Sequence, residues 1–280
     1  MAGTSLAVKS KDLYPSIFSR HAQAYDRRLD QIMSSGEARG RQRVLELVNA
    51  GPGMRILDLA CGPGNMARRL AAAVAPDGEV VGVDLAPGMI EVARSLAIPN
   101  ARFELMDIEE LSFPPASFDA ATCGHGLQFA PHLDRALSEA RRVLRPASRF
   151  AASVPVGSPS QGVIGLLDAV VDRHLPAAPR AIDQDATRRT VSDPDLLTQA
   201  ARDAGFADAR VEVIEEKVVW QSAEQLVALF TSWWDCAARL ERLTDEQRAA
   251  FIDDALDTLH RGRTGTIETA SRSLVLGATA

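Results

Sequence analysis

The chain has 280 residues, a formal net charge of −6, 46% hydrophobic residues and 24% charged residues. This length and balance fit one globular domain with a sizeable core, with or without a large insertion. The arginines are scattered among acidic residues, which argues against a nucleic-acid partner because such proteins need a basic surface. The densest basic cluster, Arg39, Arg41 and Arg43, stands at helical spacing near Glu37 and Glu46 and is expected to be a solvated helix face.

Cysteine usage and hydropathy set the expected compartment. Cys61, Cys123 and Cys236 are widely spaced and odd in number, which predicts a reducing, cytoplasmic setting without disulfides. No clustered Cys or His pattern indicates a metal site. No apolar run reaches the roughly 18 residues that a membrane span needs. Residues 1–12 contain no apolar stretch, so we expect a frayed tail and not a secretion signal.

Short apolar runs alternate with helical segments through the first half of the chain. Strands buried on both faces are near-continuous apolar runs, and helices between them imply right-handed crossovers in a parallel sheet. We therefore predict a doubly wound sheet here. The expected strands are 54–60, 79–85, 101–106, 118–123 and 149–155, and the expected helices are 65–75, 87–96 and 133–144.

The second half continues with helices and two further strands. A helix is expected over 161–175, and strands over 209–220 and 271–278. The fold class is α/β: a doubly wound, Rossmann-like sheet of about seven strands, mostly parallel with an antiparallel last strand, plus helical lid insertions. Expected helix boundaries are a start at Ser192 with Asp195, an end at Gly205, and capping boxes at Ser222 with Gln225 and at Thr244 with Gln247.

The stretch 56–67 (ILDLACGPGNMA) combines a strand, a glycine turn and the start of a helix. Gly62 and Gly64 let the backbone turn sharply and let a ligand approach without a Cβ in the way. The helix N-terminus offers free N–H groups and the positive end of its dipole. Asp84 closes the second strand, where a carboxylate accepts hydrogen bonds from the ribose hydroxyls of an adenosine.

This glycine pattern with Asp84 also fits an NAD-binding fingerprint. Two acidic residues separate the alternatives. Asp58 stands at the tip of the first strand, where a pyrophosphate would need room but an ammonium group is favoured. Asp107 follows the third strand, placed to accept from an adenine amino group, with Ile108 beside it to pack on the ring. Both favour a cationic sulfonium nucleoside.

The combined motifs resemble the class I S-adenosylmethionine-dependent methyltransferases, in particular their ubiquinone/menaquinone-biosynthesis-like branch. The likeness covers about 18–155, through ILDLACGPG, VVGVDLAPGMIEVAR, FELMDIEELSFPPASFDAATC and ALSEARRVLRPASRF. The segment 18–26 (FSRHAQAYD) resembles the family's leading helix, which closes over the cofactor. The resemblance implies a lid helix and S-adenosyl-L-methionine-binding core in 1–155. It also implies helical acceptor or lid insertions, plus the last two strands, in 156–280.

The resemblance further implies which residues hold the cofactor. Two departures stand out: Ala60 replaces the usual first glycine of D-x-G-x-G, and Pro-Ala-Ser replaces Pro-Gly-Gly at 146–148, so that turn is expected to differ in shape. The alanine is small enough to fit. The implied cofactor contacts are Asp58, Ala60, Gly62 and Gly64 around the methionine part, Asp84 on the ribose, Leu85, Met89, Asp107 and Ile108 around the adenine, and Tyr25 from the lid.

The implied reaction is an in-line SN2 transfer of methyl to a small organic acceptor, leaving S-adenosyl-L-homocysteine. Positioning alone can supply about 7–11 kcal/mol. His125 follows the fourth strand at the edge where acceptors bind, and an imidazole titrating near pH ~6.5 suits a general base. The alternative interpretation is a loop histidine that packs over the cofactor. His21, on the leading helix, is a second catalytic candidate.

Trp233 and Trp234 are expected on one helix with Leu229 and Phe230. With the helix at 161–175 they form a candidate lid that would select a hydrophobic or aromatic acceptor, such as a secondary metabolite or quinone-like compound. Either tryptophan could instead be core or a homodimer contact. Three rival functions stay open: an enzyme of the same fold without methyl transfer, such as a cyclase, an NAD(P)-dependent oxidoreductase, and a pure binding module. Release of S-adenosylhomocysteine distinguishes the first rival.

Overall fold

The computed structural model describes residues 8–34, 38–156, 162–261 and 265–280. The chain forms two compact units. The first contains residues 1–155, 181–214 and 273–280, and the second contains 156–180 and 215–272. Strands β6 and β7 each begin in one unit and end in the other.

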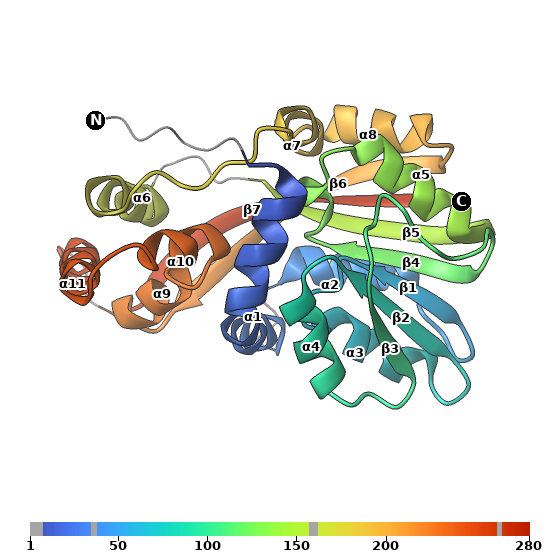
Figure 1. The fold of residues 1–280 in the computed structure, drawn as a ribbon, viewed down its shortest axis with the longest axis horizontal. Helices are drawn as coiled ribbons and strands as arrows, with labels where there is room; N and C mark the ends of the chain where they lie inside the picture. Colours follow the sequence, from blue (N-terminus) through green and yellow to red (C-terminus); the bar gives the residue numbers. More distant parts are fainter. Residues whose placement is uncertain (1–7, 35–37, 157–161, 262–264) are drawn as a thin grey trace. The chain divides into compact units, whose positions relative to one another are not determined.

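The seven strands form one sheet in the order β3-β2-β1-β4-β5-β7-β6 (Figure 1). The order reverses between β1 and β4, and ligands of open α/β sheets bind at such a switch point. The strands are β1 Arg55–Leu59, β2 Glu79–Asp84, β3 Ala101–Leu105, β4 Phe118–Gly124, β5 Leu144–Val156, β6 Ala207–Trp220 and β7 Ile267–Thr279.

Strands β1 to β5 pair in parallel, as predicted. β7 runs antiparallel to β5, because Ala280 exchanges backbone hydrogen bonds with Ala147 and Ser148 at the start of β5, both at 2.8 Å. The predicted fold class is therefore confirmed. β5 begins at Leu144, five residues earlier than expected. The segment 146–148, where Pro-Ala-Ser replaces the family's Pro-Gly-Gly, therefore lies within this strand, although Ala147 has the left-handed conformation at φ 65°.

Helices of the first unit cover the sheet and include a long N-terminal helix. They are α1 Ser10–Ser34, α2 Arg39–Val48, α3 Asn65–Val74, α4 Pro87–Ser95, the 3-10 helix η1 Leu127–Phe129, α5 Leu133–Val143, α7 Asp185–Val191 and α8 Pro194–Asp203. Those of the second unit are α6 Gly162–His174, α9 Ala223–Phe230, α10 Trp234–Leu240 and α11 Asp245–His260. No helix within the described ranges is both long enough and apolar enough to span a membrane.

Two boundary predictions were wrong. The expected frayed tail at 1–12 ends in ordered structure: Val8 bridges to Ala181 and α1 starts at Ser10, while residues 1–7 lie outside the described part. The cap of α8 is Asp193, not Ser192, since the Asp193 carboxylate accepts from the two N–H groups that follow Pro194. Proline at the first helical position favours this start.

The other caps follow the sequence signals more closely. Gly205, at φ 89°, follows the end of α8 as predicted. Thr244 and Gln247 form the predicted capping box of α11. Ser222 caps α9 by accepting from the N–H of Gln225, but the Gln225 side chain bonds the N–H of Gln221 instead of closing the box. Residue 161, the expected start of α6, is outside the described residues.

One face of the sheet changes from apolar to polar towards the carboxyl ends of the parallel strands. Ile56, Ala120, Ala151 and Val275, from β1, β4, β5 and β7, belong to one buried core cluster. Side chains alternate along a strand, so residues two positions on return to the same face. Those next positions are Asp58, Thr122, Ser153 and, on the antiparallel β7, Ser273, all at most 1% exposed. We call these four residues the polar layer.

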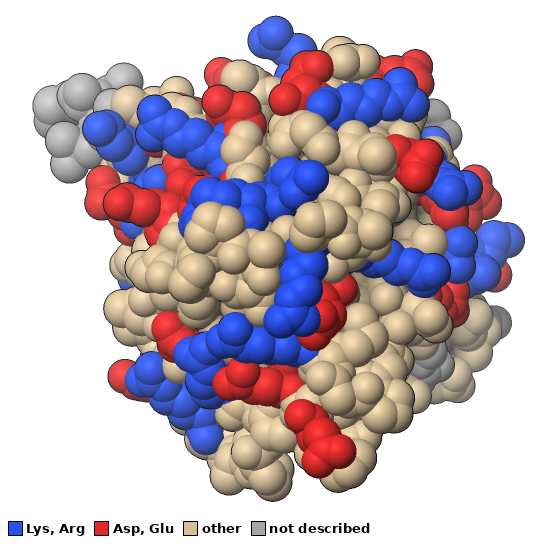
Figure 2. Space-filling model, turned by 90° about the vertical axis from the view of Figure 1, so that its right-hand side faces the viewer, with Lys and Arg blue, Asp and Glu red and all other residues tan. Residues whose placement is uncertain are grey.

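The amino ends of the parallel strands carry a chain of ion pairs. Glu79 on β2 pairs with Arg102 on β3 and with Arg55 on β1. Asp119 on β4 accepts from the backbone of Arg55 and pairs with Arg145 on β5. Positive and negative groups thus alternate across five neighbouring strands. Figure 2 shows basic and acidic side chains interleaved on the face it presents.

Candidate functional site

The first unit contains a pocket of about 960 Å³, open to solvent, at the carboxyl ends of the parallel strands. Its walls come from α1, from α2, from the loops after β1, β2, β3 and β4, and from η1. Nine of the ten predicted cofactor residues line it: Tyr25, Asp58, Ala60, Gly62, Asp84, Leu85, Met89, Asp107 and Ile108.

The two glycines of the turn do different things. Gly62, at φ 54°, has no atom within 4 Å of the place where a Cβ would sit, so it leaves space open. Gly64, at φ 90°, is not in the pocket wall. A Cβ there would meet Leu96, Phe103 and Ala93 at 3.1 to 3.4 Å, so Gly64 turns the chain and lets α3 begin against packed side chains.

Asp84 is fixed at the tip of β2 by the backbone. Its two carboxylate oxygens accept from the N–H of Gly62, at 2.9 Å, and from the N–H of Ala86, at 2.8 Å. Burial raises the pKa of Asp84, and these backbone hydrogen bonds oppose the rise. The carboxylate keeps lone pairs for two hydroxyl donors, as a ribose would supply.

Asp58 is a buried carboxylate with an unused oxygen. Thr122 donates to its Oδ1 at 2.8 Å, whereas Oδ2 has no hydrogen-bond partner among the described residues. The pKa of Asp58 is raised to about 7, mainly by burial and also by the charge of Asp84, while the Thr122 hydrogen bond, the charge of Arg41 and the backbone N–H of Ala67 act in the opposite direction. An unpaired buried acceptor is costly. A cationic donor, such as the ammonium of an amino acid, fits this wall of the pocket.

Arg41 is the main functional candidate that the sequence reasoning missed. It was expected on a solvated face, yet α2 buries it to 6% exposure in the pocket wall. Its guanidinium donates to the hydroxyl of Tyr25 at 3.2 Å. The signal was present in the spacing, because Arg41 shares a helix face with the buried Val44 and Val48. A guanidinium and a carboxylate on one wall match the two charged groups of an amino acid.

Lys11 was also missed, because it falls in the expected tail. Its ammonium group contacts Asp107 and Glu109, both at 2.6 Å. Glu109 also accepts from the backbone of His132 at 2.8 Å. Lys11 therefore joins α1 to the loop after β3, at the end of the pocket where the adenine was expected.

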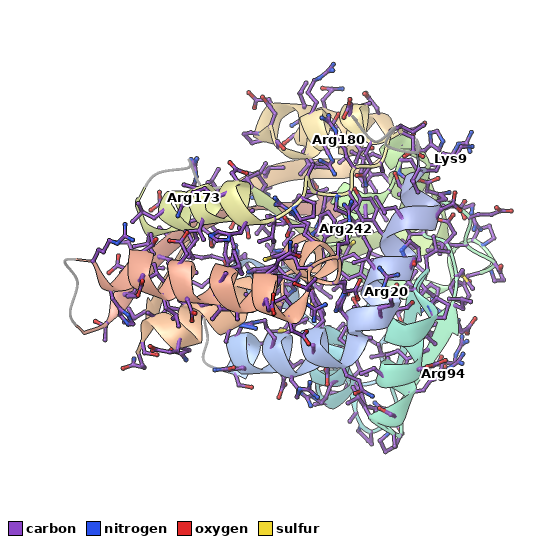
Figure 3. All side chains as sticks on the ribbon, turned by 60° about the vertical axis from the view of Figure 1, so that its left-hand side comes forward. Lys9, Arg20, Arg94, Arg173, Arg180 and Arg242 are labelled. Carbon is purple, nitrogen blue, oxygen red and sulfur yellow. The ribbon has the colours of Figure 1, made fainter. Side chains whose placement is uncertain are left out.

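The N-terminal helix docks on the rest of the first unit through close contacts. Gly88 at the start of α4 donates to the hydroxyl of Ser19, and a Cβ at Gly88 would lie 2.5 Å from the Ser19 carbonyl oxygen. Figure 3 shows α1, marked by Arg20, beside α4, marked by Arg94. α1 is thus a packed wall of the pocket.

Aromatic side chains form an apolar side of the pocket. Phe129 on η1 packs against Tyr14, with ring centroids 4.9 Å apart, and edge-on against Phe18 at 5.1 Å. Phe18 in turn meets Tyr25 at 5.9 Å. These four rings all line the pocket. Of them the sequence reasoning had singled out only Tyr25, although Tyr14, Phe18 and Tyr25 stand at helical spacing.

His125 lines the pocket after β4, and His21 does not. The backbone of His125 is left-handed, at φ 62°, with its N–H donating to the Ser153 carbonyl at 2.9 Å. Gln128 donates to its carbonyl at 2.8 Å. Burial, and then the charge of Arg41, hold the pKa of His125 well below its usual range. The imidazole is therefore neutral at physiological pH.

Two further sequence expectations concern the second unit and metals. Trp233 and Trp234 do not continue one helix with Phe230, since α9 ends at Phe230 and extended backbone at Trp233 caps α10. Their role as a lid stays a prediction. Within the described ranges, no group of three or more His, Cys, Asp or Glu side chains could hold a metal ion.

Comparison with known proteins places this site in a family. Residues 56–147 match the family model described as a methyltransferase domain. The demethylmenaquinone methyltransferase of Symbiobacterium thermophilum is 36% identical over 140 residues, which are 48% of this chain and 55% of that protein. This chain therefore spans little more than half of that relative's length.

A second relative is matched over more of its length. The ubiquinone/menaquinone biosynthesis C-methyltransferase UbiE of Shewanella oneidensis is 31% identical, over 71% of this chain and 85% of that protein. Among solved structures, the YcgJ protein of Bacillus subtilis has the same fold, with a TM-score of 0.54, 20% identity, and coverage of 86% of this chain and 97% of that one. The chain therefore belongs to the class I S-adenosylmethionine-dependent methyltransferases, in the ubiquinone/menaquinone-biosynthesis-like branch that the sequence motifs indicated.

Proposed function

We propose that this protein transfers the methyl group of S-adenosyl-L-methionine to a small, hydrophobic or aromatic organic acceptor by in-line SN2 displacement. The proposal rests chiefly on Asp58, whose buried Oδ2 has no hydrogen-bond partner among the described residues and which lies in the pocket wall. S-adenosylmethionine offers the ammonium that this oxygen needs. A dinucleotide would bring phosphate towards a carboxylate instead.

Each part of the cofactor has a matching group on the wall. Asp58 would hold the ammonium, and Arg41 would hold the carboxylate of the same amino acid through a charge-assisted hydrogen bond. Asp84 would accept from the ribose hydroxyls, and Asp107 from the adenine amino group beside Ile108. The bound cofactor supplies an electrophilic methyl on a sulfonium. The protein contributes position, because holding two reactants together removes most of the entropic barrier.

The wall chemistry supports an apolar, planar acceptor. Phe18, Phe129 and Tyr14 present aromatic surface next to the cofactor end of the pocket. Aromatic rings stack and pack edge-on with other rings in this way. The two relatives are named a demethylmenaquinone methyltransferase and a ubiquinone/menaquinone biosynthesis C-methyltransferase. We therefore propose a quinone-like or aromatic secondary metabolite as the acceptor.

His125 would meet the acceptor as a neutral group. A neutral imidazole offers one donor and one acceptor nitrogen. Because its pKa is held low by burial and Arg41, protonating it as a general base would cost free energy. The site thus favours an acceptor that attacks through carbon, or through an oxygen that is already ionised beside Arg41. A hydrogen bond from the His125 ring would orient that oxygen. The second catalytic candidate, His21, does not line the pocket, so it would contact the acceptor only where the acceptor extends beyond the pocket.

Partners and location complete the proposal. The net charge of −6, with the basic and acidic side chains interleaved on the face in Figure 2, supports the absence of a nucleic-acid partner. The half-exposed Trp233, at 36%, supports a homodimer contact as one use of that surface. Cys61, Cys123 and Cys236 are free thiols, which supports a reducing, cytoplasmic location.

Titration calorimetry with S-adenosylhomocysteine and with NAD tests the cofactor. We expect S-adenosylhomocysteine to bind and NAD to give no heat. The Asp58→Asn variant should lose most of this affinity, whereas Glu110→Gln, which removes an exposed charge near the pocket wall, should keep it. Tight binding of NAD with no heat from S-adenosylhomocysteine would disprove the proposal.

Turnover on a panel of naphthols, quinols and other phenols, with S-adenosylmethionine as donor, tests the reaction. A methyltransferase releases one S-adenosylhomocysteine for each product whose mass rises by one methylene. A cyclase-like enzyme of the same fold would convert its substrate without releasing S-adenosylhomocysteine. Product formation without that release would show that the fold serves another reaction here.

A further inference from the structure

The hydroxyl of Ser273 lies beside the ring of His125, although the two residues are 148 positions apart. Ser273 Oγ is 3.4 Å from His125 Nε2. Ser273 is 1% exposed and belongs to the polar layer, on a strand that continues with the fully buried Val275 and Leu276. Ser273 is thus a polar residue at a buried position of this strand, beside His125.

The rest of His125 is already fixed by other contacts. Its N–H and carbonyl are held by Ser153 and Gln128, and its backbone is left-handed, which non-glycine residues rarely adopt. The remaining freedom lies in the ring itself, in its rotation and in which nitrogen carries the proton. Within the described ranges, Ser273 is the hydrogen-bonding partner of that ring.

We infer that Ser273 is a positioning residue of the acceptor side of the pocket: its hydroxyl holds the His125 ring in one orientation through Nε2. A serine hydroxyl can donate to a bare Nε2 or accept from a protonated one, so this contact fixes the direction of the ring in either neutral tautomer and leaves Nδ1 for another partner. The acceptor role of His125 in this inference rests on the proposed function. Its orientation by Ser273 does not.

Three features support the inference. Burial and Arg41 keep the imidazole neutral, so a hydroxyl that either donates or accepts can pair with it at physiological pH. His125 lines the pocket, so the orientation of its ring affects what a bound molecule meets there. Hydrogen bonds to catalytic groups are commonly long before the ligand binds and tighten in the complex, which fits the 3.4 Å separation.

Nitrogen NMR of the histidine rings tests the inference directly, because the ¹⁵N shift of a ring nitrogen changes when that nitrogen gains or loses a hydrogen bond. The chain has five histidines, and an H125N variant assigns the signal. Ser273→Ala should move the Nε2 shift of His125, both in the free protein and in its complex with S-adenosylhomocysteine, towards that of a nitrogen without this hydrogen bond. Ser273→Thr should restore the original shift.

Ser153→Ala is the matched control. Ser153 has the same side chain in the same polar layer and is 0% exposed, yet its hydroxyl has no partner among the described residues. Its carbonyl, which holds the N–H of His125, survives the substitution. The His125 shifts should therefore stay as in the unaltered protein.

Two results would overturn the inference. One is an unchanged Nε2 shift of His125 in Ser273→Ala, and the other is an equal change in Ser153→Ala, which would indicate general loosening of the sheet. Failure of the free protein to bind S-adenosylhomocysteine would count against the proposed function alone, since the Nε2 shift is also measured without ligand.

Discussion

The methyl group of Ala60 occupies the space that a side chain at Gly126 would need. A Cβ at Gly126 would lie 2.4 Å from the Cβ of Ala60 and 2.8 Å from the Sγ of Cys123. Ala60 stands at φ 51°, in the left-handed region, where the family's motif usually has glycine. Gly126 itself, at φ −111°, has an ordinary backbone. Space, and not backbone conformation, therefore requires the glycine at 126.

Gly126→Ala should lower the free energy of unfolding by about 1–3 kcal/mol, because overpacking a buried site has this cost. Ala60→Gly removes one of the two obstructing atoms and relieves the left-handed alanine. The double variant should therefore recover part of the loss, with a coupling energy in the usual range of about 0.5–3 kcal/mol for contacting residues. Urea denaturation of the four proteins measures it. Strictly additive losses would show that the two loops move apart freely.

The contribution of Asp58 to the stability of the ligand-free protein should fall as the pH rises from about 4 to 7, whereas the lowered pKa of His125 acts in the opposite direction in both the unaltered protein and Asp58→Asn. Asp58 holds its proton up to about pH 7 in the folded state, whereas the unfolded chain loses it near 3.8. The folded state therefore binds more protons at Asp58 in this window, and this contribution falls with rising pH by at most about 4 kcal/mol. Asp84, whose pKa is also raised, acts in the same direction. Denaturation at several pH values should show a shallower fall for Asp58→Asn, and equal slopes would contradict the assignment.

Cofactor affinity should have the opposite dependence on pH. Asp58 must be ionised to pair with an ammonium, so the affinity for S-adenosylhomocysteine should fall about tenfold per pH unit well below pH 7. Calorimetry between pH 5.5 and 8 checks this, with adenosine, which has no ammonium group, as the comparison ligand. A flat profile for both compounds would show that Asp58 does not pair with the ammonium group.

Arg41→Gln should weaken S-adenosylhomocysteine binding by roughly 10- to 100-fold, the value of a lost hydrogen bond between charged groups. Adenosine has no carboxylate and should bind both proteins equally. Arg43→Gln is the control on the same helix, because Arg43 pairs with Glu46 and Glu212 and is not in the pocket wall. An equal loss for adenosine would place Arg41 in a purely structural role.

The polar layer should show an asymmetry between its hydroxyls. Ser153→Ala removes a buried group with no partner among the described residues and should be neutral or raise stability by up to about 1 kcal/mol. Thr122→Val removes the donor to Asp58 and should destabilise the protein at pH 8, where Asp58 is ionised. Thermal unfolding of the two variants distinguishes them. A loss in Ser153→Ala would mean that its hydroxyl is satisfied by a bound water.

Much of the sheet and of the pocket wall could be predicted because their signals are local. Strands such as β1 and β2 are short buried runs that end in a glycine turn or an aspartate, and nine predicted contacts line one pocket. Arg41 was misjudged because its charge was given more weight than its spacing, which places it on the same helix face as Val44 and Val48.

The remaining misses depend on contacts between distant parts of the chain. The start of α1 is ordered because Ser10 donates to Asp183, 173 residues later. Ser273 meets His125 only once β7 has inserted beside β5. No local pattern encodes either pairing, so they become visible only in the folded chain.

The packing of Gly64 has a consequence for mutational surveys of this motif. Its missing side chain faces Leu96 and Phe103 in the protein interior, whereas that of Gly62 leaves open space. Replacing Gly64 would thus lower the folding yield, whereas replacing Gly62 would impair ligand binding. An activity assay alone would not distinguish a misfolded Gly64 variant from a folded Gly62 variant that no longer binds its ligand.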